Sequence, residues 1–271
     1  MNFQTPAEVA AAAANSGKAK AELPIGKMIL LGILAGAYIA FGANLATVVT
    51  QNFSGQAFEI FLFGGVFSVG LMMTVIGGAE LFTGNNMFCV ISNLNGQASI
   101  GGTVYNWVVV YFANLIGSLL LVFLVYNSVY WTDGASLTAV GERALGIATG
   151  KLNLTWEAAF LRGILCNWLV CMAVWLALAA KDVIGKIFSC FFPIMAFVAS
   201  GFEHSIANMF FIPMGIAIAN GAAALGIAVP SAEIFTYGNF VFANLIPVTL
   251  GNIVGAVVFV SGFYWYTYLR K

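Results

Sequence analysis

The sequence predicts an all-α integral membrane protein with six transmembrane helices, arranged as two inverted three-helix repeats. Of its 271 residues, 61% are hydrophobic and 7% are charged, whereas about 25% of the residues in a soluble domain are charged. Six apolar stretches reach the roughly 20 residues that a helix needs to cross a bilayer. These stretches are residues 27–49, 58–91, 104–131, 158–180, 187–219 and 240–268. A soluble fold is therefore excluded.

Charge and cysteine content narrow the possible partners. The formal net charge is zero and no basic patch extends beyond the N-terminal lysines, so no nucleic-acid partner is expected. The four cysteines show no Cys-x-x-Cys spacing, and the chain has one histidine. A metal site, a disulfide framework or another cofactor is therefore not expected. The expected partner of the apolar surface is membrane lipid.

The chain before the first span, residues 1–26, is predicted to be a cytoplasmic N-terminal amphipathic segment. Residues 5–20 are rich in alanine, and Pro6 stands where a helix would begin. This stretch is too short and too polar to cross a bilayer, and it does not read as a secretory signal. We expect it to lie along the cytoplasmic surface of the membrane.

The second and fifth apolar stretches are too long for unbroken helices. Each contains a polar segment that begins at a glycine: residues 78–88 read Gly-Ala-Glu-Leu-Phe-Thr-Gly-Asn-Asn-Met-Phe, and residues 201–210 read Gly-Phe-Glu-His-Ser-Ile-Ala-Asn-Met-Phe. Polar backbone at membrane depth occurs only where it is buried in protein or lines a water-filled cavity. Paired breaks in the two halves of a chain indicate a transport pathway.

The other spans contain further repeated motifs. Gly-Ile-Leu occurs at 32–34 and again at 163–165, and Asn-Leu-Ile-Gly at 114–117 resembles Asn-Ile-Val-Gly at 252–255. Together with the polar segments, these pairs have offsets of 131, 138 and 123 residues. Each half then holds three spans, and an odd number of spans turns the second copy upside down.

The predicted architecture is one channel domain, with a first repeat over 27–131 and a second over 151–268. A rival register exists, because Phe-Ala-Asn-Leu-Ile occurs at 112–116 and again at 242–246. Periodicity does not choose between the two registers. Both give three spans in each half.

The orientation follows from the positions of lysine and arginine. Seven of them lie on one side of the six spans: Lys18, Lys20, Lys27, Lys181, Lys186, Arg270 and Lys271. Arg143 and Lys151 lie on the other side. Because positively charged flanks remain in the cytoplasm, we expect both termini to be cytoplasmic in a multi-pass protein of a bacterial-type inner membrane.

One long motif carries a family resemblance. Phe-Val-Ala-Ser-Gly-Phe-Glu-His-Ser-Ile-Ala-Asn-Met at 197–209, with Glu-Leu-Phe-Thr at 80–83 and Thr-Leu-Gly-Asn at 249–252, resembles the formate/nitrite transporter family. The resemblance covers essentially the whole chain. It implies an aquaporin-like hourglass that assembles as a homopentamer, with one pore in each protomer. It also implies a substrate that is a small monovalent anion, namely formate, nitrite or hydrosulfide, or its conjugate acid.

His204 is the only histidine, and it takes the place that Leu81 holds in the first polar segment. A lone histidine is often a satisfied core residue, but an ionisable side chain within a span is a functional candidate. Desolvation favours the neutral imidazole, which donates one hydrogen bond and can accept a proton. We hypothesise that a weak-acid anion is hydrogen-bonded or protonated at His204 and passes as a neutral molecule, because a bare anion loses its hydration in an apolar constriction.

The resemblance adds further pathway residues by their local motifs. Thr83 and Asn252 would orient the substrate beside His204, and Lys151 would concentrate anions in a vestibule unless it is only a headgroup lysine. Two apolar constrictions are implied, one formed by Phe67, Leu71 and Phe197, and the other by Leu81, Phe82 and Val170. Without the motif context, such side chains would be ordinary core residues.

The two glutamates of the polar segments, Glu80 and Glu203, are interpreted as structural, because a carboxylate in an anion pathway repels the substrate. We expect them to bind backbone N–H groups that the helix breaks set free. Arg162 in the fourth span is left without an assigned role.

Two other classes of function are less favoured. A membrane-embedded enzyme could use Glu203 and His204 as acid and base, but it would need more convergent polar groups or a metal. A neutral-solute channel of the aquaporin kind would carry paired Asn-Pro-Ala loops, which the sequence lacks. The chain is therefore predicted to be a passive or proton-coupled channel or transporter, and not an enzyme. Which of the three anions it prefers is left open.

Overall fold

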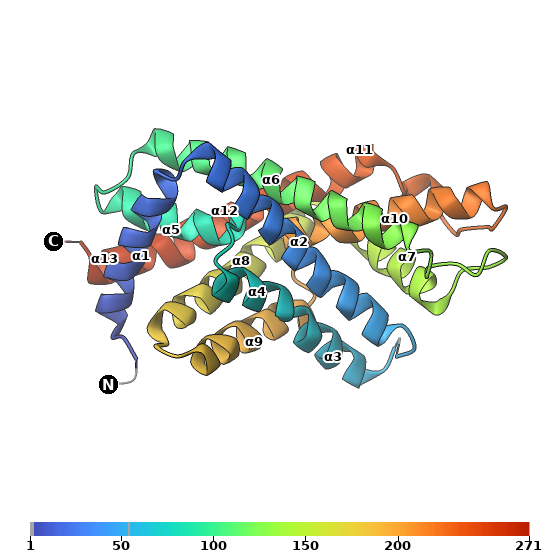
Figure 1. The fold of residues 1–271 in the computed structure, drawn as a ribbon, viewed down its shortest axis with the longest axis horizontal. Helices are drawn as coiled ribbons and strands as arrows, with labels where there is room; N and C mark the ends of the chain where they lie inside the picture. The colour runs from blue at the N-terminus through green and yellow to red at the C-terminus, as the bar shows by residue number, and fades with distance from the viewer. Residues whose placement is uncertain (1–2, 54, 271) are drawn as a thin grey trace.

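The computed structural model describes residues 3–53 and 55–270. Among those residues, six helices are long and apolar enough to cross a membrane. They cover Ile25–Thr50, Phe58–Gly77, Ile100–Asn127, Trp156–Ala179, Ser205–Ala224 and Tyr237–Tyr268. The predicted all-α class with six spans is confirmed (Figure 1).

Several helices begin after a residue whose side chain satisfies a free backbone N–H group. Side chains of Thr5, Ser99, Thr138, Thr155 and Asp182 each accept such a bond in the first turn. The elements are α1 (Pro6–Ala21), α2 (Ile25–Thr50), α3 (Ala57–Phe67), α4 (Val69–Gly77), α5 (Phe82–Leu94), α6 (Ile100–Asn127), α7 (Ala139–Leu152), α8 (Trp156–Ala179), α9 (Val183–Ala199), α10 (Ser205–Ala224), the 3-10 helix η1 (Ala232–Ile234), α11 (Tyr237–Asn239), α12 (Ile246–Val254) and α13 (Phe263–Tyr268), with π-helical stretches η2 (Phe240–Leu245) and η3 (Gly255–Gly262) in the last span.

The two predicted helix breaks are confirmed. Residues 78–81 separate α4 from α5, and residues 200–204 separate α9 from α10. Gly78 has φ +79° and Gly201 has φ +70°, a left-handed conformation that glycine adopts without a Cβ penalty. Figure 1 shows α5 running toward the end of the molecule that holds both termini, and α10 running toward the opposite end. The N-termini of these two half-helices therefore face the middle.

Each repeat packs two of its long helices closely. At Gly117 of α6, an added Cβ would lie 2.0 Å from the carbonyl oxygen of Ile33 in α2. At Gly255, it would lie 2.3 Å from the carbonyl oxygen of Ile164 in α8. Offsets of 138 and 131 residues relate these two pairs. The same close approach, which small residues permit between membrane helices, is thus built twice.

Two asparagines decide the register of the repeat. Asn114 Nδ2 donates to the carbonyl oxygens of Gly32 (2.7 Å) and Glu80 (2.9 Å). Asn252 Nδ2 donates to the equivalent oxygens of Gly163 (2.8 Å) and Glu203 (2.9 Å). The 138-residue offset therefore describes the structure. The rival register fails because it would pair Asn114 with a residue that makes different bonds.

The repeat also includes α1 and α7, which extend beyond the predicted repeat boundaries. α1 packs against α5, and α7 packs against α10. The face of α1 that is buried in this contact consists of Val9, Ala10, Ala13, Ala14 and Gly17. The N-terminal helix is therefore part of the packed bundle as well as a candidate surface segment. Its cytoplasmic location stays a prediction.

Candidate functional site

The centre of the candidate site is a contact between the two half-helices. Thr83 is the second residue of α5, and His204 precedes the first residue of α10. The Thr83 Oγ1 atom lies 2.9 Å from His204 Nε2. The two residues are 0% and 3% exposed. The fold thus brings together two predicted pathway residues that come from opposite repeats.

A backbone contact fixes the position of the imidazole proton. The Ala207 N–H donates to His204 Nδ1 over 3.1 Å, so His204 caps α10 in the way that a polar N-cap residue does. A proton on Nδ1 would face this donor. The neutral ring therefore carries its proton on Nε2 and donates it to Thr83 Oγ1. The hydroxyl proton of Thr83 remains available for a third group.

Two helix starts are directed at the same place. The first turn of a helix presents free N–H groups and a partial positive charge, and such ends bind anions. Because α5 and α10 diverge from the middle of the molecule (Figure 1), both positive ends lie at the Thr83–His204 contact. The centre of the protein is electrostatically suited to an anion even though His204 is neutral.

Asn252, predicted to orient the substrate, has most of its hydrogen-bonding capacity used by backbone around the second break. Its Oδ1 accepts from the Ser205 N–H over 2.9 Å, and its two Nδ2 hydrogens serve the bonds to Gly163 and Glu203. One lone pair of Oδ1 is left. The structure thus gives Asn252 a bracing role, and its contact with a substrate stays a prediction.

The glutamates at the breaks bind side chains, which corrects the expectation that they would bind backbone N–H groups. The carboxylate of Glu203 lies 3.0 Å from Lys151 Nζ and accepts from Asn208 Nδ2 at 2.6 Å. Asn208 also donates to Asn244 Oδ1 (2.7 Å), and Asn244 donates to the carbonyl oxygen of Lys151 (3.1 Å). The backbone N–H groups of Phe82 and Ser205 need no carboxylate, because the side chains of Asn114 and Asn252 accept hydrogen bonds from them.

The second quartet is our name for the four residues Lys151, Glu203, Asn208 and Asn244.

The first repeat contains the same closed arrangement. Lys20 Nζ lies 2.7 Å from Glu80, which accepts from Asn85 at 2.7 Å. Asn85 donates to Asn106 (2.9 Å), and Asn106 donates to the Lys20 carbonyl oxygen (2.9 Å). We call these residues the first quartet. In each quartet the lysine is paired with a buried glutamate. Lys151 lines the second cavity, and its role in concentrating anions stays a prediction.

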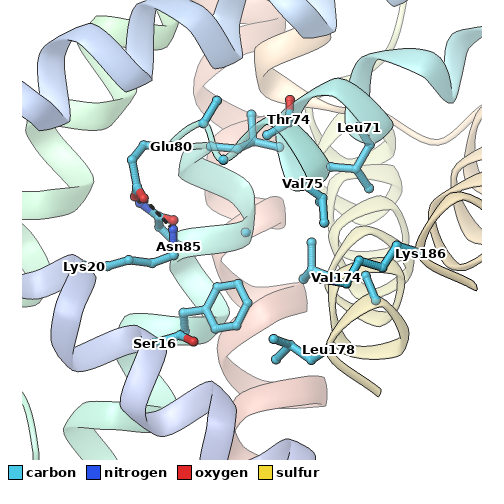
Figure 2. A pocket seen from close by; sticks show the side chains of 16 residues that line it. Ser16, Lys20, Leu71, Thr74, Val75, Glu80, Asn85, Val174, Leu178 and Lys186 are labelled. Atoms are coloured by element: carbon cyan, nitrogen blue, oxygen red, sulfur yellow. Dashed lines mark hydrogen bonds and ion pairs between the residues drawn. The ribbon is translucent and has the colours of Figure 1, made fainter. Parts of the chain in front are cut away.

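Two cavities lie on either side of the central contact. The first, about 240 Å³, is lined by residues of α1, α4, α5, α8 and α9, including the first quartet's Lys20 and Glu80 (Figure 2). The second, about 210 Å³, is lined by residues of α3, α7, α9 and α10, including Lys151 and Glu203. His204 lines the second cavity. The polar quartets therefore face the two approaches to the half-helix contact.

Four of the predicted constriction residues line the two cavities. Phe67 and Phe197 line the second cavity, and their rings meet edge to face with centroids 6.0 Å apart. Leu71 and Leu81 line the first cavity. Leu71 stands about one helical turn beyond Phe67, past the junction of α3 and α4 at Ser68, and lines the first cavity. Its place in one constriction with Phe67 and Phe197 stays a prediction.

The two remaining constriction candidates line neither of these cavities. Val170 of α8 is 1% exposed. The Phe82 ring packs edge-on against Tyr111 and Trp107, with centroids 4.9 and 6.2 Å apart. Their place in a constriction stays a prediction.

Several polar residues at the site were missed in the sequence. Asn167 of α8 donates to the carbonyl oxygens of Thr83 (3.2 Å) and Asn252 (2.7 Å), and so joins both repeats. The Ser205 hydroxyl at the start of α10 is buried without a partner among the described residues. The quartet asparagines did leave a signal, because Asn85 and Asn208 recur at the 123-residue offset of the breaks.

Six apolar helices in inverted repeats, with two half-helices meeting at a polar centre between cavities, define a multi-pass membrane transport protein. Comparison with known proteins identifies the group more closely. The model of the family described as Formate/nitrite transporter matches residues 7–266. The chain belongs to the formate/nitrite transporter family, as its motifs had indicated.

Two curated relatives match along nearly their whole length. A protein of Methanothermobacter thermautotrophicus called "Probable formate transporter" is 46% identical, with 100% of this chain and 99% of the relative covered. The "Formate channel FocA" of Escherichia coli K12 is 39% identical, with coverages of 98% and 95%. Among solved structures, a "Pentameric formate channel with formate bound" superposes with a TM-score of 0.79 at 40% identity, covering 91% of this chain and 98% of that one.

Proposed function

We propose that this protein is a channel for small monovalent anions of weak acids, with formate as its first substrate and nitrite and hydrosulfide as candidates of the same class. The observation that carries the proposal is the buried Thr83–His204 contact of 2.9 Å at the facing starts of two half-helices. The relatives named as formate transporters and channels support formate. The pentameric neighbour supports assembly of this chain as a homopentamer with one pore in each protomer.

In this proposal the substrate meets hydrogen-bond donors at the centre. A carboxylate or nitrite oxygen would accept the Thr83 hydroxyl proton, which the bond from His204 Nε2–H leaves free. The Ser205 hydroxyl, buried and without a partner among the described residues, is a second donor at the start of α10. The positive ends of α5 and α10 favour the negative charge of the substrate.

The geometry at Nδ1 bears on where the proton comes from. Protonating His204 would place an N–H against the Ala207 N–H, so the ring acts as a donor and not as the source of the proton. At pH 7 a small carboxylic acid with the acidity of an aspartate side chain is only about one part in a thousand protonated. We propose that the anion takes a proton from water in a cavity, crosses the apolar part as the neutral acid, and releases the proton on the far side.

The test is formate flux into proteoliposomes with internal pH recorded from about 5 to 8, a range over which the protonated share of such an acid falls about a thousandfold. Flux accompanied by internal acidification supports a channel that passes formate with a proton. If folded protein transports hydrosulfide or nitrite but no formate, the substrate is one of these two anions and not formate. Osmotic water flux far above anion flux would instead favour a neutral-solute channel.

The histidine is tested with His204→Phe against His204→Asn. Asparagine keeps an acceptor for the Ala207 N–H and an amide donor, whereas phenylalanine keeps neither. We expect the asparagine variant to retain most of the formate flux and the phenylalanine variant to lose most of it, because only asparagine keeps a donor at this place. A folded His204→Phe protein with the flux of the wild type removes the histidine from the mechanism.

A further inference from the structure

The two cavities have the same polar quartet but differ in one additional cation. Lys186, in the first turn of α9, lines the first cavity, and Arg143 of α7 lines the second. Figure 2 shows Lys20 and Lys186 on opposite walls of the first cavity. These two cations are not equivalent in the repeat: the 123-residue offset that relates Gly78 to Gly201 relates Phe63, in the wall of the second cavity, to Lys186.

The charge of Arg143 is compensated. Its guanidinium forms an ion pair with Glu59 and donates to Thr50 Oγ1. Lys151 is paired with Glu203 in the same cavity. The charged groups in and directly bound to the second cavity are therefore two cations and two carboxylates, with no net charge beside the neutral His204.

The charge of Lys186 is not compensated. Its half-buried side chain has no ion pair or hydrogen bond from its ammonium to any residue that the structure describes. Asp182, four residues earlier, is exposed and binds the Gly185 N–H as the cap of α9. Since Glu80 neutralises only Lys20, the first cavity holds two lysines and one carboxylate, a net charge of one positive unit.

Helix stability does not explain a lysine at this place. The start of a helix carries a partial positive charge, and a cation in the first turn opposes it. An anion in the cavity would be attracted by both the Lys186 ammonium and the start of α9. A partly desolvated cavity strengthens that attraction, because the effective dielectric constant is lower than in water.

We propose that the first cavity is a docking site for the small monovalent anion, with Lys186 as its recruiting cation, and that transport therefore saturates at a lower anion concentration from the side of the termini. This inference rests on the proposed function for its substrate. The difference between the two mouths comes from one unpaired ammonium on one side and a neutral set of ion pairs on the other. The two mouths thus differ in their affinity for the anion.

The test compares sodium formate uptake from each side in proteoliposomes of one orientation, checked by protease access to the N-terminal segment. At about 10 mM salt, where screening is weak, we expect a half-saturating formate concentration about three to ten times lower from the side of the termini. Lys186→Gln should abolish that difference by raising the value on this side alone. Lys186→Arg should keep it, and Lys18→Gln, which removes an exposed charge outside the cavity, should match the wild type.

A second measurement does not need transport. An amine-reactive reagent is applied to the wild-type protein with and without sodium formate, and labelling is read by mass spectrometry. Formate should slow the labelling of Lys186 several-fold and leave Lys18 unchanged. Protection of Lys186 without any flux would support the docking site and refute the proposed function. Formate flux that Lys186→Gln does not alter, without protection of Lys186, would refute the docking site and leave the function standing.

Discussion

His204 and Leu81 occupy equivalent places before the two half-helices, and Thr83 is matched by Ile206. The imidazole and hydroxyl that touch each other thus come from opposite repeats, and an apolar residue stands at each equivalent position. The Thr83–His204 pair makes the centre asymmetric, because the equivalent positions in the other repeat are apolar and form no such hydrogen bond. At this scale, function resides in the departures from the repeat, with Lys186 in place of Phe63 as another.

Thr83→Val should lower formate flux while leaving the fold intact, because valine has nearly the shape of threonine but lacks the hydroxyl. The loss of one hydrogen bond to the substrate is worth about 0.5–1.5 kcal/mol, which corresponds to a reduction of about two- to tenfold. Initial rates in proteoliposomes, normalised to folded protein, measure it. Thr83→Ser keeps the hydroxyl and should transport like the wild type. Equal rates for the valine variant and the wild type would rule out the hydroxyl as a substrate contact.

At the scale of elements, each break is held by residues from other helices. Asn114 of α6 and Asn252 of α12 bind the backbone on both sides of a break, and the quartets tie α1 to α5 and α7 to α10. A half-helix that starts inside a bilayer leaves N–H groups that water cannot satisfy. Asn114 and Asn252 accept hydrogen bonds from such N–H groups, so the starts of the half-helices keep fixed positions around the candidate site.

The close approach of α2 and α6 gives a prediction about stability. Gly117→Ala would place a Cβ 2.0 Å from the Ile33 carbonyl oxygen, which forces the helices apart at a cost of about 1–3 kcal/mol or more. We expect a lower midpoint of thermal unfolding in detergent, followed by tryptophan fluorescence. The control is Gly146→Ala on the exposed face of α7, where an added Cβ meets nothing within 4 Å. Alanine there should stabilise the helix by about 0.5–1 kcal/mol. If both variants unfold at the same temperature, the close packing of α6 on α2 is not essential.

At the scale of the whole molecule, inverted repeats place equivalent structures at opposite ends. α1 and both termini lie at one end and α7 lies at the other (Figure 1). Each end then has a quartet and a cavity of similar size. The centre is reached from two matched approaches, and the polarity between them comes from only a few side chains.

The orientation of the protein in the membrane is a prediction that reporter fusions can test. Because lysine and arginine gather at the end that holds the termini, both termini should be cytoplasmic. Green fluorescent protein fused to either terminus should fluoresce, and alkaline phosphatase fused there should be inactive. A phosphatase inserted between Asp133 and Ser136, in the connection from α6 to α7, should be active. Active phosphatase at either terminus would show that the predicted orientation is wrong.

The sequence by itself determined the class, the six spans and the two breaks, and it marked His204 as a candidate. These features depend on local physics. The length of an apolar stretch shows whether it can cross a bilayer, and Gly78 and Gly201 indicate left-handed turns. A single ionisable side chain within a span is a functional candidate. Only the tertiary structure decided that Asn252 braces a break, that Leu71 and Phe67 face different cavities, and that Lys151 is neutralised by Glu203. The reason is that hydrogen bonds and ion pairs join residues far apart in the chain, from 47 residues for Ser205 and Asn252 to 121 for Thr83 and His204. Their partners depend on how the helices pack, which no local pattern of residues specifies.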